Sequence, residues 1–261
     1  MSDVATEHRF EAREPAVRTI GVGDVTASLA AGWRDFLATP TQLFFLALIY
    51  PVAGLVLGFA ASGSDLLTIV WPLVAGFALL GPIAALGIYE MSRRREQNLP
   101  VSAMNGLDVF RSAGIGSIVG VALVLLVLFV GWLLSAEWIY RTTIGPDHPA
   151  SFAALWRVTT GTSEGHRLML VGNLVGFVFA VAALAVSVVS LPLLLDRDVG
   201  TVAAIRTSVR AVAANPVPMA LWGLIVAGLL LLGSLPLLVG LAVVIPVLGH
   251  ATWHLYRRVL A

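Results

Sequence analysis

Long apolar runs recur along this chain, and they restrict its fold more than any other feature of the sequence. Four runs cover about residues 42–61, 69–91, 114–135 and 168–194. A further apolar stretch, from Pro218 to Trp253, has about twice this length. A break at Gly233, Ser234 and Pro236 within it predicts a tight hairpin between two spans. Because a helix needs about 20 mostly apolar residues to cross a bilayer, the sequence predicts an all-α membrane bundle of six transmembrane helices.

The composition also indicates a membrane protein. Hydrophobic residues make up 58% of the chain and charged residues 12%, against roughly 25% charged residues in soluble domains. The net charge of +1 leaves no field of one sign that would attract nucleic acid. The absence of cysteine excludes disulfides, thiolate nucleophiles and Cys-ligated metal sites. The first 40 residues lack the apolar core of a cleavable signal, so we expect the first span to act as an uncleaved anchor.

Arginine is distributed unevenly between the two sides that six spans would define. With the N-terminus inside, 13 of the 16 arginines fall in cytoplasmic segments: Arg9, Arg13, Arg18, Arg34, Arg93, Arg94, Arg95, Arg111, Arg197, Arg206, Arg210, Arg257 and Arg258. The other side holds Arg141, Arg157 and Arg167. Because cytoplasmic loops of membrane proteins are enriched in basic residues, this distribution predicts that both termini are cytoplasmic.

Part of the sequence pattern recurs after 164 residues. The first copy contains Trp71, Pro72, Gly76, Pro82, Tyr89, Arg93 and Arg94, and the second contains Leu235, Pro236, Gly240, Pro246, Trp253, Arg257 and Arg258. An amphipathic stretch precedes each copy, opening at Asp24 or Asp198 and ending before Pro40 or Pro216. Asp as an N-cap and Pro beyond the end are helix signals, so we expect two interfacial helices. Both copies run in the same direction, which predicts a parallel internal repeat.

The repeat suggests a simple domain organisation. We expect a flexible cytoplasmic tail over residues 1–23 and a single six-span membrane domain over residues 24–261. Repeat units cover about residues 24–95 and 198–259. The middle hairpin, about residues 102–196, is a candidate third unit that has diverged, although its lead-in from Leu107 to Arg111 is short.

Two histidines lie four residues apart near the cytoplasmic end of the sixth predicted span. His250 and His254 therefore share one helix face, as two metal or haem ligands would. The segment lacks the Glu of the HExxH zinc motif. The alternatives are interfacial histidines beside Trp253 and Tyr256, or a polar contact between His254 and Glu90, which the repeat places at equivalent positions.

Further candidate residues lie where spans leave the hydrocarbon on the predicted cytoplasmic side: Glu90, Arg93, Arg94, Asp196, Arg197 and Asn215. Glu90 forms either an interfacial ion pair with a neighbouring arginine or a gate or proton site. Pro51, Pro82 and Pro246 fall inside predicted helices, where they favour kinks that either line a cavity or serve packing. The sequence contains no catalytic triad, Walker loop or dinucleotide fingerprint, so we expect no enzymatic activity and no cofactor.

Two long motifs have the length and specificity of a family signature. The first runs from Gly76 to Glu96, and the second combines Ser190 to Arg197, Asn215-Pro216 and Pro246 to Arg257. Together they resemble a bacterial integral membrane family, domain of unknown function 2189, over about residues 30–258. Some members of that family are labelled as related to cytochrome c oxidase subunit I. A haem–copper core needs more spans and more ligand histidines than this chain offers.

Three functional hypotheses follow. The first is a non-enzymatic protein of the bacterial inner membrane that binds lipid or partner proteins through its Arg-lined cytoplasmic side. It would act as a scaffold, or as an accessory or assembly factor of a respiratory or other membrane complex. The second is a small-solute transporter or channel, suggested by parallel repeats with kinked helices. The third is a haem- or metal-binding membrane protein linked to respiration. The sequence favours the first, and it predicts no oligomeric state.

Overall fold

The computed structural model of the chain describes residues 15–39, 41, 49, 67–146, 149 and 151–260. The first predicted span, about residues 42–61, lies outside these residues apart from Ile49. The described residues fold into helices: α1 (Val22–Ala38), α3 (Leu67–Ala84), α4 (Leu86–Glu96), the 3-10 helix η2 (Ala103–Arg111), α5 (Ile115–Thr143), α6 (Phe152–Gly161), α7 (Ser163–Ser187), α8 (Ser190–Asp196), α9 (Thr201–Ala214), α10 (Pro216–Ser234) and α11 (Leu241–Val259). The predicted all-α fold class is therefore confirmed.

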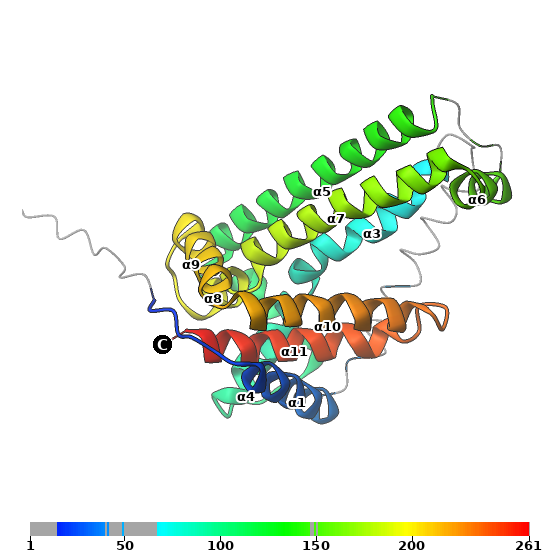
Figure 1. Cartoon of the computed structure of the whole chain (residues 1–261). Coiled ribbons are helices and arrows are strands. Elements are labelled where there is room, and N and C mark those ends of the chain that lie inside the picture. Colours follow the sequence, from blue (N-terminus) through cyan, green and yellow to red (C-terminus); the bar gives the residue numbers. More distant parts are fainter. Residues whose placement is uncertain are drawn as a thin grey trace, which may run out of the picture.

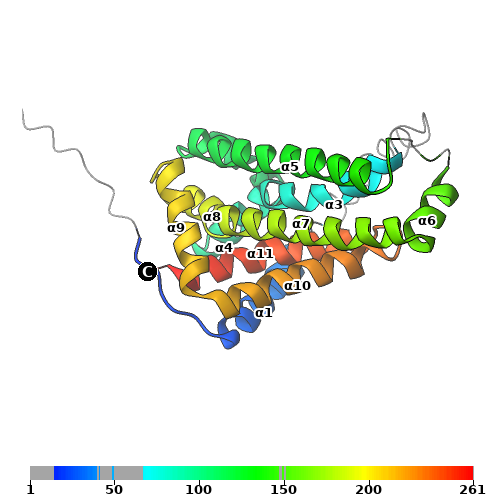
Figure 2. The same cartoon turned by 45° about the horizontal axis from the view of Figure 1, so that its top comes forward.

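The long helices α3, α5, α7, α10 and α11 form an elongated bundle (Figures 1 and 2). The short helices α8 and α9 lie at one end of this bundle, together with the C-terminus, and α6 lies at the other. We call the end that carries α8 and α9 the cap end.

Four helical segments of the described chain are long and apolar enough to cross a membrane. They are Pro72–Glu96, Ile115–Thr143, Ser163–Asp196 and Pro216–Ser234, and they correspond to the second to fifth predicted spans. Helix α11, the predicted sixth span, has 19 residues but carries His250, His254, Arg257 and Arg258 in its second half. These polar residues lower the mean hydropathy of α11, so it is not among the four segments that are apolar enough to cross a membrane.

The third predicted span is longer than expected. The sequence placed its end near residue 135, whereas α5 continues to Thr143. The Ser135 hydroxyl donates a hydrogen bond to the carbonyl of Gly131. Arg141 forms an ion pair with Glu137, one turn earlier in the same helix. These polar residues are therefore compatible with the helix. Gly145, whose φ of 120° lies outside the helical region, follows the helix end.

A break in the fourth span separates α7 from α8 at Val188 and Val189. Pro192 explains its position, because a proline ring clashes with the carbonyl four residues earlier. The amide of Val189 donates to the hydroxyl of Ser208 on α9 at 3.2 Å. A neighbouring helix thus satisfies a buried donor that the break would otherwise leave unpaired.

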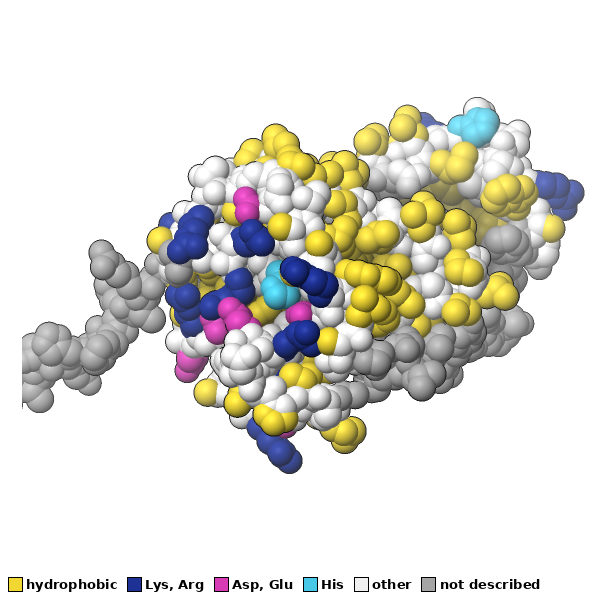
Figure 3. Space-filling view, turned by 90° about the horizontal axis from the view of Figure 1, so that it is seen from below, with side chains coloured by type: hydrophobic (Ala, Val, Ile, Leu, Met, Phe, Trp, Pro, Cys, Tyr) yellow, Lys and Arg dark blue, Asp and Glu magenta, His cyan; other side chains and the backbone are white. Residues whose placement is uncertain are grey.

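The charged side chains gather at the cap end, and apolar side chains cover much of the surface beside it (Figure 3). Many large apolar side chains of α5, α7 and α10 are exposed, among them Leu123, Val127, Leu170, Phe177, Leu224 and Leu231. Buried apolar side chains are concentrated in α4, α8 and α11. This distribution suits a bundle whose outer surface faces lipid and whose tightest packing lies near the cap end.

Three short elements pack across the cap-end parts of the long helices. Helix α1 packs on α11, η2 packs on α4, and α9 packs on α7 and α8. Helix α9 turns a face of small residues toward the bundle, Ala204, Thr207, Ser208 and Ala211. Val202 and Val209, on its apolar stripe, are exposed. Ile205 and Val212 on the same stripe are partly buried against the core, so α9 uses only part of its apolar stripe for packing.

The predicted Asp N-caps of α1 and α9 are wrong by two or three residues. Helix α1 is capped by Gly21, and Asp24 one turn later accepts the Gly21 amide at 2.9 Å. Helix α9 is capped by Gly200, whose φ of 79° favours glycine. In both cases the Asp signal lies near the helix start but at a different cap position.

Part of the predicted tail has defined contacts. Val17 forms an isolated antiparallel bridge with Leu260, and the Arg18 amide donates to the Val259 carbonyl at 2.8 Å. Residues 1–14 lie outside the described part. The segment before α1 thus lies along the end of α11.

Candidate functional site

The arginine run at the end of α4 connects three different elements. Arg93 binds Glu90 of the same helix with two nitrogens, at 2.7 and 2.9 Å. Arg94 reaches Asp108 of η2 at 3.2 Å. Arg95 pairs with Asp35 of α1 at 3.0 Å. Because successive helical residues point about 100° apart, one run can hold partners on several sides.

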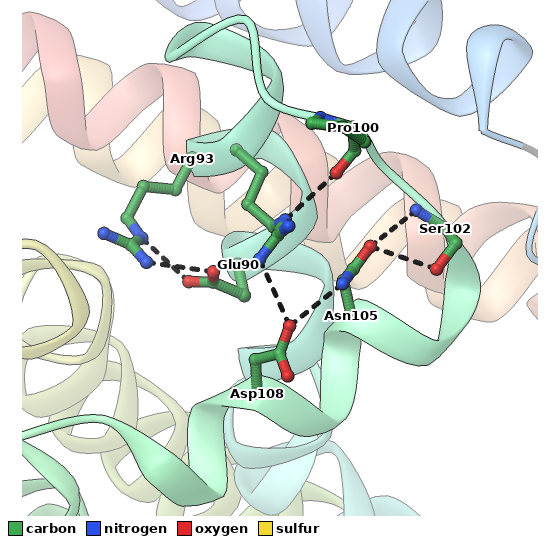
Figure 4. A network of polar contacts seen from close by, with 7 residues as sticks. Glu90, Arg93, Pro100, Ser102, Asn105 and Asp108 are labelled. Carbon is green, nitrogen blue, oxygen red and sulfur yellow. Dashed lines mark hydrogen bonds and ion pairs between the residues drawn. The ribbon is translucent and has the colours of Figure 1, made fainter.

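The contact of Arg94 is part of a polar network around the start of η2 (Figure 4). Arg94 also donates to the carbonyl of Pro100 at 3.1 Å. Asn105 donates to the same Asp108 oxygen at 2.9 Å and accepts hydrogen bonds from the amide and hydroxyl of Ser102. This network fixes η2 to the last turns of α4, and we call it the Arg94 latch.

Asp35 lies at the centre of a second cluster, which joins α1, α4 and α11. Its carboxylate is bound by His254 Nε2 at 2.8 Å and by the Ser92 hydroxyl at 3.1 Å, in addition to Arg95. Ser92 is also 2.7 Å from His250 Nδ1. We call these five residues the Asp35 cluster. Asp35 is 7% exposed, so these contacts hold a carboxylate that is largely removed from water.

The environment of Asp35 shifts its acidity. Burial would raise the pKa of this carboxyl, but the hydrogen bond from His254 and the charges of His254 and His250, with the Ser92 hydroxyl, lower its pKa below the ordinary value. The carboxylate form is therefore the stable one in this cluster.

A third group, the Asp196 cluster, joins α8, α4 and α11. The Tyr256 hydroxyl donates to Asp196 at 2.6 Å, and Arg257 lies 3.3 Å from the same oxygen. Arg257 also binds Glu96 at 2.9 Å, and Glu96 accepts the Trp253 indole proton at 3.1 Å. Ion pairs that bridge several helices fix their relative positions, whatever their net contribution to stability.

The predicted histidine pair does not converge on one partner. His250 meets Ser92, whereas His254 meets Asp35. Of the two alternatives for the pair, the contact between His254 and Glu90 is not the one found, since His254 binds Asp35 and Arg93 binds both carboxylate oxygens of Glu90. Within the described residues, no group of three or more His, Asp or Glu side chains is placed to hold a metal ion.

Asn215 has a different place from the other candidates, at the junction of α9 and α10. Its side-chain oxygen accepts the Ile20 amide at 2.7 Å, and its nitrogen donates to the carbonyls of Arg18 and Ala211, each at 3.0 Å. With 1% of its surface exposed, Asn215 clamps the segment before α1 to the end of α9. Arg197, the remaining candidate, lies 3.6 Å from its neighbour Asp196.

The structure thus brings the predicted residues other than Asn215 into the charged network of the cap end. It confirms the predicted ion pair of Glu90 with a neighbouring arginine and gives Arg94, Asp196, His250 and His254 partners that the sequence did not identify. The unforeseen partners are Asp35, Ser92, Arg95, Glu96, Asp108, Tyr256 and Arg257. Asp35 carried a usable signal, since it follows Ser28 and Gly32 at helical spacing on a face of α1 that contains small residues. The others gave no sign of their partners.

Comparison with known proteins agrees with the membrane fold. Residues 70–196 match the model of a family described as predicted integral membrane protein, domain of unknown function 2189. This segment contains Glu90, Arg93, Arg94 and Asp196 and ends before the other candidate residues. No curated protein and no solved structure matches the chain. The resemblance carried by the sequence motifs is thus confirmed over residues 70–196, which are similar to this family of predicted integral membrane proteins.

Proposed function

We propose that the chain is a six-span protein of the bacterial inner membrane, with both termini cytoplasmic, that acts as a non-enzymatic scaffold or accessory protein. The observation that carries this proposal is the polar network of the cap end. Asp35, Glu96 and Asp196 connect α1, α4, α8 and α11 through short contacts. A network of this kind gives the helix ends a fixed arrangement, which suits a platform that binds another protein or lipid headgroups.

The proposed topology is supported by where the arginines lie. Arg93, Arg95, Arg257 and Arg258, from helices far apart in the sequence, all pair with acids at one end of the bundle. Helix α6, which contains Arg157, lies at the opposite end (Figure 1). Helix α11 packs beside α10, as expected for the second half of a hairpin. These placements agree with a positive cytoplasmic side.

The parallel repeat is supported by equivalent packing in its two copies. Tyr89 and Trp253, which are 164 residues apart, are both buried. Each lies one turn before an arginine that forms an ion pair, Arg93 or Arg257. Equivalent positions of α4 and α11 thus hold a buried aromatic side chain and, one turn later, an arginine in an ion pair.

Copurification tests the scaffold proposal. The tagged chain would be isolated from its native membranes in mild detergent, and everything bound to it would be identified by mass spectrometry. We expect a stable protein partner that is retained by Arg157→Gln, at the far end, and reduced by Arg34→Gln, an exposed position of α1. A chain that copurifies with no protein partner, and whose bound lipid is unaffected by either change, would contradict the proposal.

Transport is the second candidate function, and the helix breaks favour it. The chain is interrupted at Ala85, three residues after Pro82, and again at Val188 and Val189. Broken helices in repeated units form substrate sites in many transporters. Solute flux into liposomes that is lost in Pro82→Ala and Pro246→Ala, but kept in Pro218→Ala within the first turn of α10, would establish this alternative.

A further inference from the structure

The 3-10 helix η2 has three faces with three different environments. A 3-10 helix has three residues per turn, so residues three apart lie on the same face. Gly106 and Val109 form the face against the protein, where Val109 is 4% exposed and Gly106 meets Gly87 of α4. The second face carries Asn105 and Asp108, which belong to the Arg94 latch.

The third face is apolar and exposed. Met104, Leu107 and Phe110 are 71%, 51% and 72% exposed. Arg111 follows directly and is also exposed. A soluble domain would turn such a stripe toward its core. Here the Arg94 latch and the Gly106 contact hold the stripe away from the protein.

The packing of η2 matches that of α1 at an equivalent position of the repeat. A Cβ atom on Gly32 of α1 would lie 2.6 Å from the Cβ of Ala251 in α11. A Cβ atom on Gly106 of η2 would lie 3.3 Å from the Cα of Gly87 in α4. Ala251 and Gly87 are 164 residues apart, the spacing of the repeat. The glycine of η2 thus meets α4 where the glycine of α1 meets α11.

The surroundings of η2 indicate what covers its apolar face. Helix α5 begins four residues after η2, at Ile115, and exposes Val119, Leu123 and Val127 along its length. The apolar stripe of η2 is therefore followed in the chain by the lipid-facing surface of a candidate span. Arg111 between them matches the negative charge of anionic headgroups.

We infer that η2 is an in-plane lipid anchor. Met104, Leu107 and Phe110 insert among the acyl chains of the leaflet at the cap end, and Arg111 lies at the level of anionic phospholipid headgroups. The middle hairpin thereby acquires an in-plane element of its own, equivalent to α1. This inference rests on the proposed placement of the cap end at the cytoplasmic membrane surface, and it names anionic lipid as the ligand of that surface.

Labelling at single cysteines tests the anchor, because the chain has no cysteine of its own. Spin labels would be placed at Met104→Cys, Leu107→Cys and Phe110→Cys in vesicles that contain phosphatidylglycerol. Leu123→Cys in α5 is the lipid-exposed reference, and Gln97→Cys in the exposed turn after α4 is the aqueous reference. Collisions with oxygen and with a water-soluble nickel complex report the depth of each label. Variants with the elution profile of the parent chain would be compared.

We expect oxygen to collide more often than nickel at the three stripe positions, as at the Leu123 reference. Arg111→Gln would move the stripe labels toward the aqueous values in phosphatidylglycerol vesicles and leave them unchanged in vesicles of phosphatidylcholine alone. Stripe labels that resemble the Gln97 reference would overturn the inference, as would labels protected from both reagents, which would indicate a protein partner.

The orientation of the cap end is measured separately. A membrane-impermeant maleimide applied to inside-out and right-side-out vesicles shows on which side Gln97→Cys lies. A periplasmic Gln97 would refute the proposed topology, while the depth of the stripe labels would still decide whether η2 inserts. Loss of a copurifying partner in Arg34→Gln likewise concerns the scaffold proposal alone.

Discussion

Removal of the Asp35 carboxylate should weaken the attachment of α1 more than the removal of any surface ion pair. Asp35→Ala leaves Arg95 and His254 without their acceptor, but these side chains are 44% and 29% exposed, so water replaces part of what they lose. The Ser92 hydroxyl stays buried and keeps only its contact with His250. Hydrogen bonds to a charged group contribute about 1.5–3 kcal/mol each before such compensation, and we expect a net loss of about 2–3 kcal/mol.

Unfolding in mixed micelles, followed by tryptophan fluorescence, measures this loss. A destabilisation of about 2.8 kcal/mol corresponds to a change of roughly a hundredfold in the unfolding equilibrium. Asp24→Asn is the matched control, because Asp24 also joins α1 to α11 but pairs with Arg258 at the surface, where both side chains are about 40% exposed. Such surface pairs contribute about 0–1 kcal/mol. Equal effects of Asp35→Ala and Asp24→Asn would refute the reasoning.

The pH dependence of a second variant, Asp35→Asn, provides an independent check. The pKa of Asp35 is lowered in the folded protein, so its contribution to stability is present above the ordinary pKa of an aspartate. That contribution is lost as pH falls through the lowered value. The difference in unfolding free energy between the parent chain and Asp35→Asn should therefore shrink toward zero in acid. A difference that grows below about pH 4 would contradict the assigned contacts.

Three further changes address individual contacts, each measured by the same unfolding assay. Gly32→Val inserts a side chain where α1 touches α11 and should detach α1, which faster proteolysis before residue 39 would reveal. In the control Gly23→Ala the new side chain meets no neighbour, and the free energy of unfolding should change by no more than about 1 kcal/mol. Asn215→Ala leaves the buried Ile20 amide without its acceptor and should cost about 1–3 kcal/mol, with faster hydrogen exchange at that amide. Tyr256→Phe removes the 2.6 Å bond to Asp196, and a loss of about 1.5–3 kcal/mol is expected. No change in stability would contradict the assigned bond.

The apolar runs predicted the helices well because burial in lipid depends mainly on local composition. The second to fifth predicted spans each coincide with a candidate span of the structure. Helix ends were predicted less accurately, as α5 shows, because a few polar residues do not stop a helix whose side chains bond to its own turns. Composition indicates which segments lie in lipid, and local hydrogen bonding decides where they end.

The partners of the candidate residues could not be predicted in the same way. The sequence places Glu90 equally close to Arg93 and Arg94, yet only Arg93 binds it, because Arg94 turns toward η2. His254 meets Asp35 through the packing of α1 on α11, a contact between segments whose relative position no local pattern specifies. Asp35 itself was recognisable only as a polar residue among small ones on α1.

The pairing of α1 with α11 also affects how the chain is made. His254 follows its partner Asp35 by 219 residues, and at typical elongation rates of about 5–20 residues per second this interval lasts roughly 10–40 s. For most of that time α1 has left the ribosome, but the helix that receives it does not yet exist. The Asp35 carboxylate must remain hydrated at the membrane surface until α11 arrives. A ribosome that stalls within the last hairpin would therefore leave a chain whose α1 has no helix to pack against.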